Sequence, residues 1–218
     1  MRLKTKEEIA VAYILGKEDS IVVNIQALMA ALLAKVWQKT KDEWLMDFAR
    51  KQINFVLKRK TSYHAWYYTF PANKSLIKHD NYHTGGILDA LLEYAEITDD
   101  KEVEDVYWQG LEYYRENLFE ADGAPRWIND KKYPFDVHGA AQGIITFTKA
   151  AKHRPGYKKM VYLIADWTIK NLYRQKKKDF IYRRSRFFKY NFSLMHWCNG
   201  WMTRALAELI KNNNKYGK

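Results

Sequence analysis

Residues 83–92 read HTGGILDALL, a stretch in which small residues alternate with leucine and isoleucine. Residues 24–33, NIQALMAALL, align with it, and related stretches follow at 138–145, HGAAQGII, and 197–206, WCNGWMTRAL. The copies recur at intervals of roughly 55–60 residues, a spacing typical of repeated helical units. Each copy is apolar around most of its circumference, which indicates a helix enclosed by other helices. The sequence therefore predicts a repeat of buried inner helices.

Between the copies lie segments with apolar residues on one helical face and charges on the other, which is typical of outer helices. We expect inner helices near residues 23–36, 80–94, 136–147 and 197–209, and outer helices near 42–57, 100–118 and 161–172. Inner and outer helices that alternate along a chain form αα-hairpins. Aromatic connectors follow the outer helices at residues 65–68, 126–128 and 180–183, and we expect them to be extended. The predicted fold class is all-α, a curved array of αα-hairpins with short aromatic extended connectors.

The composition sets the size of the core and the kind of partner. A chain of 218 residues can bury one sizeable core, so we predict a single domain over residues 1–218. Its net charge of +12 indicates an anionic partner or a role in solubility, and the basic runs 176–178 and 183–186 suggest a local basic rim. The single cysteine, Cys198, favours a reducing compartment. Because neither a signal-peptide pattern nor a membrane-spanning apolar run is present, we expect a cytoplasmic protein.

Polar residues open the later inner helices. Asp80 precedes His83 and Asp136 precedes His138, while Trp197 lies at the start of the last inner helix. Because the inner helices share one direction, their starts should meet at one end of the array and form a pocket. The candidate catalytic residues are Asp80, Asp136, His83 and His138. The candidate substrate-binding residues are Arg126, Trp127, Tyr133, Gln142, Arg183, Trp197, Asn199 and Trp201.

Each of these residue types has a structural alternative. The two aspartates stand where helix N-caps belong, the histidines could satisfy buried neighbours, and the tryptophans could fill the core. The functional interpretation is that two carboxylates across a cleft divide the acid and base or nucleophile roles of glycoside cleavage. Aromatic walls stack on sugar rings, and an arginine can pair with a uronate. We expect no cofactor and no metal, because the sequence lacks a helical histidine pair, a thiolate cluster and a phosphate-binding glycine loop.

Three strings carry a resemblance to a known family: DNYHTGGILDAL at residues 80–91, YPFDVHGAAQ at 133–142 and WCNGWMTRALAEL at 197–209. They resemble six-hairpin, α/α-toroid proteins of the glycosidase-like superfamily, especially bacterial and archaeal members encoded with polysaccharide-biosynthesis genes. More distantly, they are similar to unsaturated glucuronyl hydrolases and to the helical domain of glucuronyl C5-epimerases. The resemblance implies a partial (α/α) toroid of about three and a half hairpins. It also implies a polysaccharide substrate, often an acidic one, which suits the positive charge.

Three functions remain open from the sequence. The first is a carbohydrate-active enzyme, namely a glycosidase, lyase or epimerase acting on an acidic oligo- or polysaccharide. The second is a non-catalytic component that binds or assembles a polysaccharide. The third is a helical scaffold for protein partners, whose unpaired last inner helix could form a homodimer at the open end of the hairpin array. A nucleic-acid partner is not expected, because the sequence carries no classical nucleic-acid-binding motif.

Overall fold

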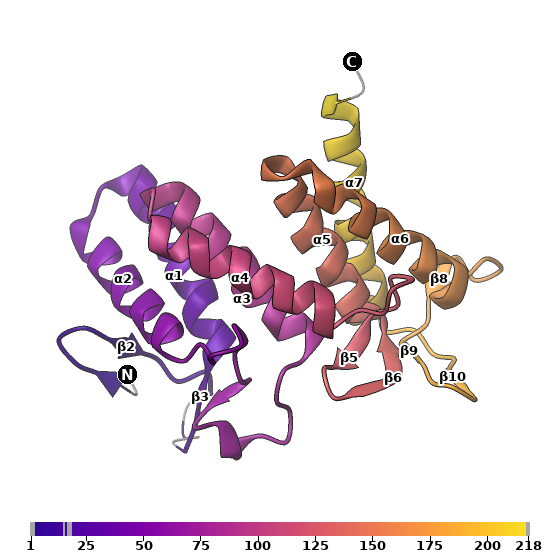
Figure 1. Ribbon diagram of the computed structural model, residues 1–218, viewed down its shortest axis with the longest axis horizontal. Coiled ribbons are helices and arrows are strands. Elements are labelled where there is room, and N and C mark those ends of the chain that lie inside the picture. Colours follow the sequence, from indigo (N-terminus) through magenta and orange to yellow (C-terminus); the bar gives the residue numbers. More distant parts are fainter. Residues whose placement is uncertain (1–2, 15, 17–18, 217–218) are drawn as a thin grey trace. The chain divides into compact units, whose positions relative to one another are not determined.

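The computed structural model describes residues 3–14, 16 and 19–216 (Figure 1). Its internal contacts group the chain into two compact units. The first comprises Met1–His79 and Gly86–Tyr114, and the second comprises Asp80–Gly85 and Arg115–Lys218. The single domain over residues 1–218 stays a prediction. Among the described residues, every helix is too short or too polar to cross a membrane.

The first unit is built mainly from helices. These are α1 (Val23–Thr40), α2 (Glu43–Lys58), and the greater parts of α3 (Asn81–Thr98) and α4 (Lys101–Asn117). Helices α1 and α2 pack against each other as a hairpin. The antiparallel strand pairs are β1 (Leu3–Lys4) with β2 (Ile9–Ala10) and β3 (Ile21–Val22) with β4 (Thr69–Phe70), followed by the 3-10 turn η1 (Ala72–Lys74).

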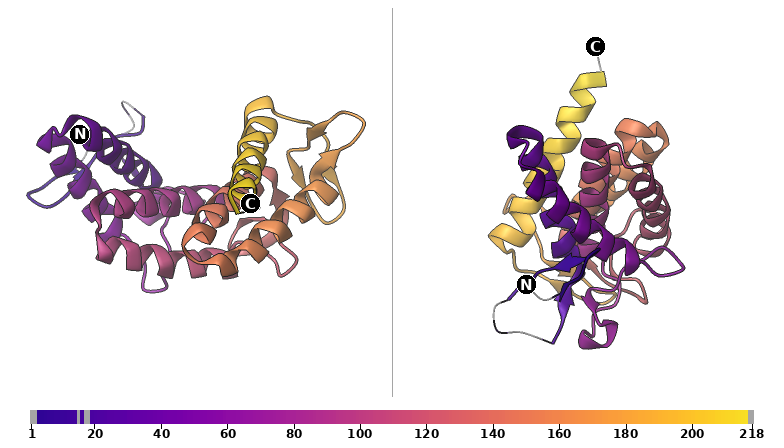
Figure 2. Two further views of the ribbon diagram at one scale, coloured as in Figure 1. Left: turned by 90° about the horizontal axis from the view of Figure 1, so that it is seen from above. Right: turned by 90° about the vertical axis from the view of Figure 1, so that its left-hand side faces the viewer.

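The second unit combines helices with a small sheet. Its helices are α5 (Val137–His153), α6 (Lys158–Leu172) and α7 (Trp201–Tyr216), with the 3-10 turn η2 (Pro155–Tyr157) and the π-helical turn η3 (Met195–Gly200). Helix α5 packs against both α6 and α7 (Figure 2). The antiparallel sheet has the order β10 (Lys189–Tyr190), β9 (Arg183–Arg184), β6 (Lys131–Asp136) and β5 (Arg126–Ile128), and β7 (Tyr173–Arg174) pairs with β8 (Asp179–Phe180).

The burial of the helices explains the alternation in the sequence. Every residue of α5 from Val137 to Thr148 is buried, as an enclosed helix requires. The alanines of α1 are buried as well, whereas α2 and α6 keep charged residues on an exposed face. The predicted all-α fold, its inner and outer helices and its extended connectors are therefore confirmed. One boundary differs, because the last inner helix opens with a π-helical turn at Met195 before α7 begins at Trp201.

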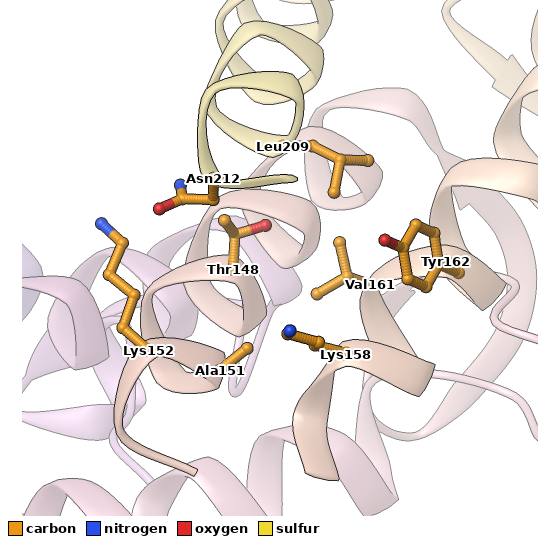
Figure 3. Close-up of a pocket in the computed structure, with 8 residues that line it drawn as sticks. All are labelled: Thr148, Ala151, Lys152, Lys158, Val161, Tyr162, Leu209 and Asn212. Carbon is orange, nitrogen blue, oxygen red and sulfur yellow. The ribbon is translucent and has the colours of Figure 1, made fainter. Parts of the chain in front are cut away.

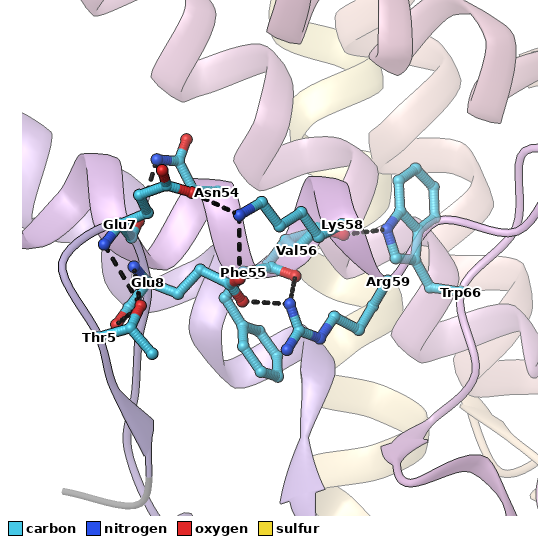
Figure 4. A network of polar contacts seen from close by, with 9 residues as sticks. All are labelled: Thr5, Glu7, Glu8, Asn54, Phe55, Val56, Lys58, Arg59 and Trp66. Atoms are coloured by element: carbon cyan, nitrogen blue, oxygen red, sulfur yellow. Dashed lines mark hydrogen bonds and ion pairs between the residues drawn. The ribbon is translucent and has the colours of Figure 1, made fainter.

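A polar network attaches the N-terminal segment to α2 in the first unit (Figure 4). Lys58 pairs with Glu7 at 2.8 Å and with Glu8 at 3.1 Å, and Arg59 also pairs with Glu8. The Arg59 guanidinium lies 4.0 Å from the ring centroid of Phe55, so it contributes packing as well as charge. The segment before α1 is thus anchored to the hairpin that follows it.

Candidate functional site

The starts of the three later inner helices meet at a pocket within the second unit. Its volume is about 390 Å³, counted out to its open mouth. The first turn of α3, the junction of β6 and α5, and the turn η3 all contribute to its lining, together with β5 and β9. The lining residues are Asp80, Asn81, Tyr82, His83, Trp127, Asp136, His138, Gly139, Tyr182, Arg183 and Trp197.

Asp80 and His83 form a hydrogen-bonded pair at the start of α3. The Asp80 carboxylate is 4% exposed and accepts the backbone N–H of His83 at 2.9 Å, so it caps the helix. Its two oxygens also lie 2.8 and 2.9 Å from His83 Nδ1. An ionised carboxylate only accepts hydrogen bonds, so Nδ1 carries the proton. Asp80 therefore fixes both the orientation and the tautomer of the imidazole, and leaves Nε2 as the acceptor nitrogen of neutral His83.

Asp136 caps α5 and also holds an arginine. One carboxylate oxygen accepts the backbone N–H groups of His138 at 2.9 Å and Gly139 at 3.1 Å. The other oxygen accepts Nε of Arg183. Burial raises the pKa of Asp136 above its ordinary value, while Arg183 and the two amides act in the opposite direction. Both oxygens of Asp136 are thus committed to positioning neighbouring groups.

The Arg183 guanidinium lies between aromatic rings at the pocket. Its central carbon is 4.4 Å from the ring centroid of Trp127 and 4.5 Å from that of Tyr182. Its Nε is bound to Asp136, and its terminal nitrogens make no hydrogen bond within the described part of the chain. A guanidinium held close to indole and phenol rings is pre-organised to bind a carboxylate through two parallel hydrogen bonds.

His138 is a buried, neutral imidazole in the same pocket. Its ring stacks on Tyr82 at 3.6 Å between centroids, and Trp197 meets it edge-on at 4.5 Å. Burial lowers the pKa of His138 to about 3, and the neighbouring His83, His196 and Arg183 act in the same direction. Its Nε2 is buried and has no hydrogen-bond partner among the described residues. A ligand hydroxyl group is the kind of partner that would satisfy this nitrogen.

The structure separates the twelve sequence candidates into two groups. Asp80, His83, Asp136, His138, Trp127, Arg183 and Trp197 line the pocket. The other five are not part of its lining. Arg126 pairs with Glu120, Tyr133 packs on Phe135, Gln142 donates to Thr146, Asn199 accepts the N–H of Phe180, and Trp201 packs on Tyr82 and His138.

Sequence reasoning missed four lining residues: Asn81, Tyr82, Gly139 and Tyr182. Asn81 and Tyr82 stand between the two candidates Asp80 and His83, so their sequence position could have identified them as lining residues. Tyr182 was visible only as an aromatic beside a basic run. Gly139 brings two helix starts together, because a Cβ there would lie 2.9 Å from Asn81 Cγ.

Comparison with solved structures identifies the class of fold. The chain has an α/α-toroid fold, as the sequence resemblance implied. Comparisons of the sequence with protein-family models and with curated proteins gave no match.

Particular structures of this class match most of the chain at low sequence identity. The GH76A α-1,6-mannanase of a Salegentibacter species matches with a TM-score of 0.72 and 12% identity, over 90% of this chain and 56% of that one. Cellobiose 2-epimerase from Bacillus thermoamylovorans matches with a TM-score of 0.67 and 14% identity, over 91% of this chain and 58% of that one. A glycosyl hydrolase of family 88 from Bacteroides vulgatus matches with a TM-score of 0.64 and 13% identity, over 88% of this chain and 62% of that one. The chain therefore spans somewhat more than half the length of these proteins.

Proposed function

We propose that the protein binds an acidic sugar of an oligo- or polysaccharide in this pocket and transfers a proton to or from it. The observation that carries the proposal is Arg183, whose terminal nitrogens are available beside the aromatic rings of Trp127 and Tyr182. Aromatic faces stack on sugar rings, and the guanidinium matches a carboxylate.

The structural neighbours support a carbohydrate ligand. They include an epimerase of cellobiose and a mannanase, and an inactive variant of that mannanase was solved with α-1,6-mannotriose. That variant matches this chain with a TM-score of 0.71 and 12% identity. At such identity the likeness supports the fold, and the pocket's own residues must supply the argument for the ligand.

The Asp80–His83 pair is the group best placed for proton transfer. In neutral His83 the proton on Nδ1 is held by Asp80, so Nε2 can act as a general base. Pairing a uronate carboxylate with Arg183 would make the adjacent C–H bond more acidic, and loss of that proton is the step that lyases and epimerases share. In this proposal Asp136 positions Arg183, and His138 offers Nε2 to a sugar hydroxyl.

The test compares two aspartates that cap helices in the same way. Asp80 caps α3, and Asp100 caps α4 by accepting the N–H of Val103 at 3.1 Å. Asp80→Asn and Asp100→Asn should each lower the free energy of unfolding by about 1 kcal/mol or less. Only Asp80→Asn and His83→Gln should abolish product formation from uronic-acid oligosaccharides, followed by NMR and mass spectrometry. Equal turnover in wild type and Asp80→Asn would contradict the proposed role.

A non-catalytic polysaccharide-binding or assembly component is the second candidate. It is favoured by the hydrogen bonds that commit the Asp80 and Asp136 carboxylates to helix capping and to positioning neighbouring side chains. It predicts salt-sensitive binding of acidic oligosaccharides that Arg183→Ala weakens, with no product after long incubation. Detection of any cleaved or epimerised sugar would exclude it.

Two further expectations belong to the proposal. A homodimer through the last inner helix is supported by Ile210, which is 59% exposed on α7. A cytoplasmic location is favoured by the single cysteine, Cys198, a buried free thiol.

A further inference from the structure

A basic segment follows α6 in the second unit. Residues 173–192 contain eight lysines and arginines and a single acid, Asp179, in a chain whose whole net charge is +12. Asp179 is bound by Arg174 at 2.7 and 2.5 Å. The remaining basic residues have no ion pair with an acid of the described residues except Arg183, which pairs with Asp136. The segment therefore concentrates positive charge within twenty residues of the chain.

Exposed aromatic rings lie in the same segment. Strands β9 and β10 form a hairpin closed by the hydrogen bond from Ser185 N–H to the Phe188 carbonyl at 2.8 Å. Phe187 is 85% exposed and Phe188 is 55% exposed, while the Arg186 guanidinium lies 5.0 Å from the Phe187 ring centroid. Neighbouring aromatic rings that are exposed to water are typical of a binding surface.

This hairpin continues directly from the pocket. Tyr182 and Arg183 line the pocket at the base of the hairpin. The Tyr182 N–H donates to the Phe192 carbonyl at 2.9 Å, and their rings lie 5.3 Å apart. Strand β9 pairs with β6 on one side and with β10 on the other, so the sheet joins the wall of the pocket to the exposed hairpin.

We infer that the β9–β10 hairpin binds the chain of an acidic polysaccharide beyond the sugar held in the pocket. The inference rests on the proposed function. Repeating carboxylates on a sugar chain would meet Arg186 at the tip of the hairpin, while sugar faces would stack on Phe187 and Phe188. The continuity with the pocket favours a polysaccharide over an anionic membrane or a single-stranded nucleic acid. Those two partners have no need of a neighbouring sugar pocket.

The experiment measures affinity as a function of chain length. Arg186→Ala with Phe187→Ala removes one cation and one exposed ring at the tip of the hairpin. Lys39→Ala with Trp44→Ala is the matched control, because Trp44 is 65% exposed and both residues belong to the first unit. Affinities are measured by calorimetric titration with a galacturonate disaccharide and octasaccharide. The hairpin variant should bind the octasaccharide roughly tenfold more weakly than wild type does, and the disaccharide with unchanged affinity. The control variant should bind both as the wild type does.

The outcomes separate this inference from the proposed function. If the hairpin variant binds the octasaccharide as tightly as wild type, the hairpin inference is wrong and the pocket proposal stands. If wild type binds neither oligosaccharide, both are wrong. Vesicles of phosphatidylserine and phosphatidylcholine and a single-stranded RNA serve as alternative probes. Tighter binding of either probe than of the octasaccharide, lost in the hairpin variant, would overturn the inference in favour of that partner.

Discussion

Individual residues in the pocket show how one residue type can serve two purposes. Asp80 and Asp136 both cap helices, as their sequence positions allowed, and both also orient a side chain that lines the pocket. Asp80 holds the imidazole of His83, whereas Asp136 holds the guanidinium of Arg183. The capping and functional interpretations of these aspartates are therefore compatible, because a carboxylate has enough lone pairs for both.

His138 makes stability depend on pH. Its folded-state pKa is about 3, whereas in the unfolded chain its pKa should lie near the ordinary value of 6.5. Between these values the unfolded state binds a proton that the folded state does not, so the free energy of unfolding falls as the pH falls. The expected slope is at most about 1.4 kcal/mol per pH unit. Urea unfolding of wild type and His138→Gln, at about pH 7.5 and about pH 5.5, measures it.

The His138→Gln variant is the control for the pH dependence that other titrating groups contribute. Its unfolding free energy should fall by about 1 kcal/mol less than that of wild type over this interval. An identical pH dependence in the two proteins would show that His138 is not held neutral by the fold.

At the scale of secondary-structure elements, close approach of the helix starts shapes the pocket. Helix α5 has a glycine at residue 139, where a Cβ would lie 2.9 Å from Asn81 Cγ and 3.0 Å from Asn81 Cβ. Asn81 itself donates to the Leu118 carbonyl at 2.8 Å, which fixes the start of α3. Any side chain at residue 139 would therefore displace the turn that carries Asp80 and His83.

Gly139→Ala should destabilise the protein by about 1–3 kcal/mol, because overpacking forces Asn81 to move. It should also weaken binding of the acidic disaccharide. Gly86→Ala is a control within α3, because a Cβ at residue 86 would meet no described atom within 4 Å. That substitution should raise stability by up to about 1 kcal/mol through helix propensity. Thermal unfolding of both variants and their titration with the acidic disaccharide measure these effects. A Gly139→Ala variant more stable than wild type would refute the predicted overpacking against Asn81.

At the scale of the whole molecule, a second hollow bears on self-association. Counted out into the open solvent at its mouth, its volume is about 320 Å³, and it lies among α5, α6 and α7 (Figure 3). Leu209 and Val161 line it, and the buried Thr148 hydroxyl in its wall has no hydrogen-bond partner within the part of the chain that the structure describes. The hollow is lined by Leu209, which precedes the exposed Ile210 in α7, and we expect it to accept a second copy of the chain.

Leu209→Glu should therefore convert the proposed homodimer to a monomer, because it places a charge in the contact. Ile169→Glu is the matched control, since Ile169 is 46% exposed on α6 and lies outside the lining of the hollow. Sedimentation velocity over a wide concentration range measures both variants. A wild-type protein that sediments as a monomer throughout would exclude this dimer.

The sequence by itself determined the helices and their alternation. The periodic apolar pattern of residues 138–147 predicted a buried helix, and Asp136 was placed correctly at its N-cap. These features are predictable because helical periodicity and capping depend on residues within a few positions of one another.

Only the tertiary structure decided which candidates share the pocket. Asp136 and Arg183 are partners in the register of β6 and β9, although 47 residues separate them in the chain. Cross-strand partners bring their side chains to the same face, and no local pattern specifies which strands will pair. The same long-range packing directed Asn199 to the backbone of Phe180 and brought Tyr182 into the pocket wall.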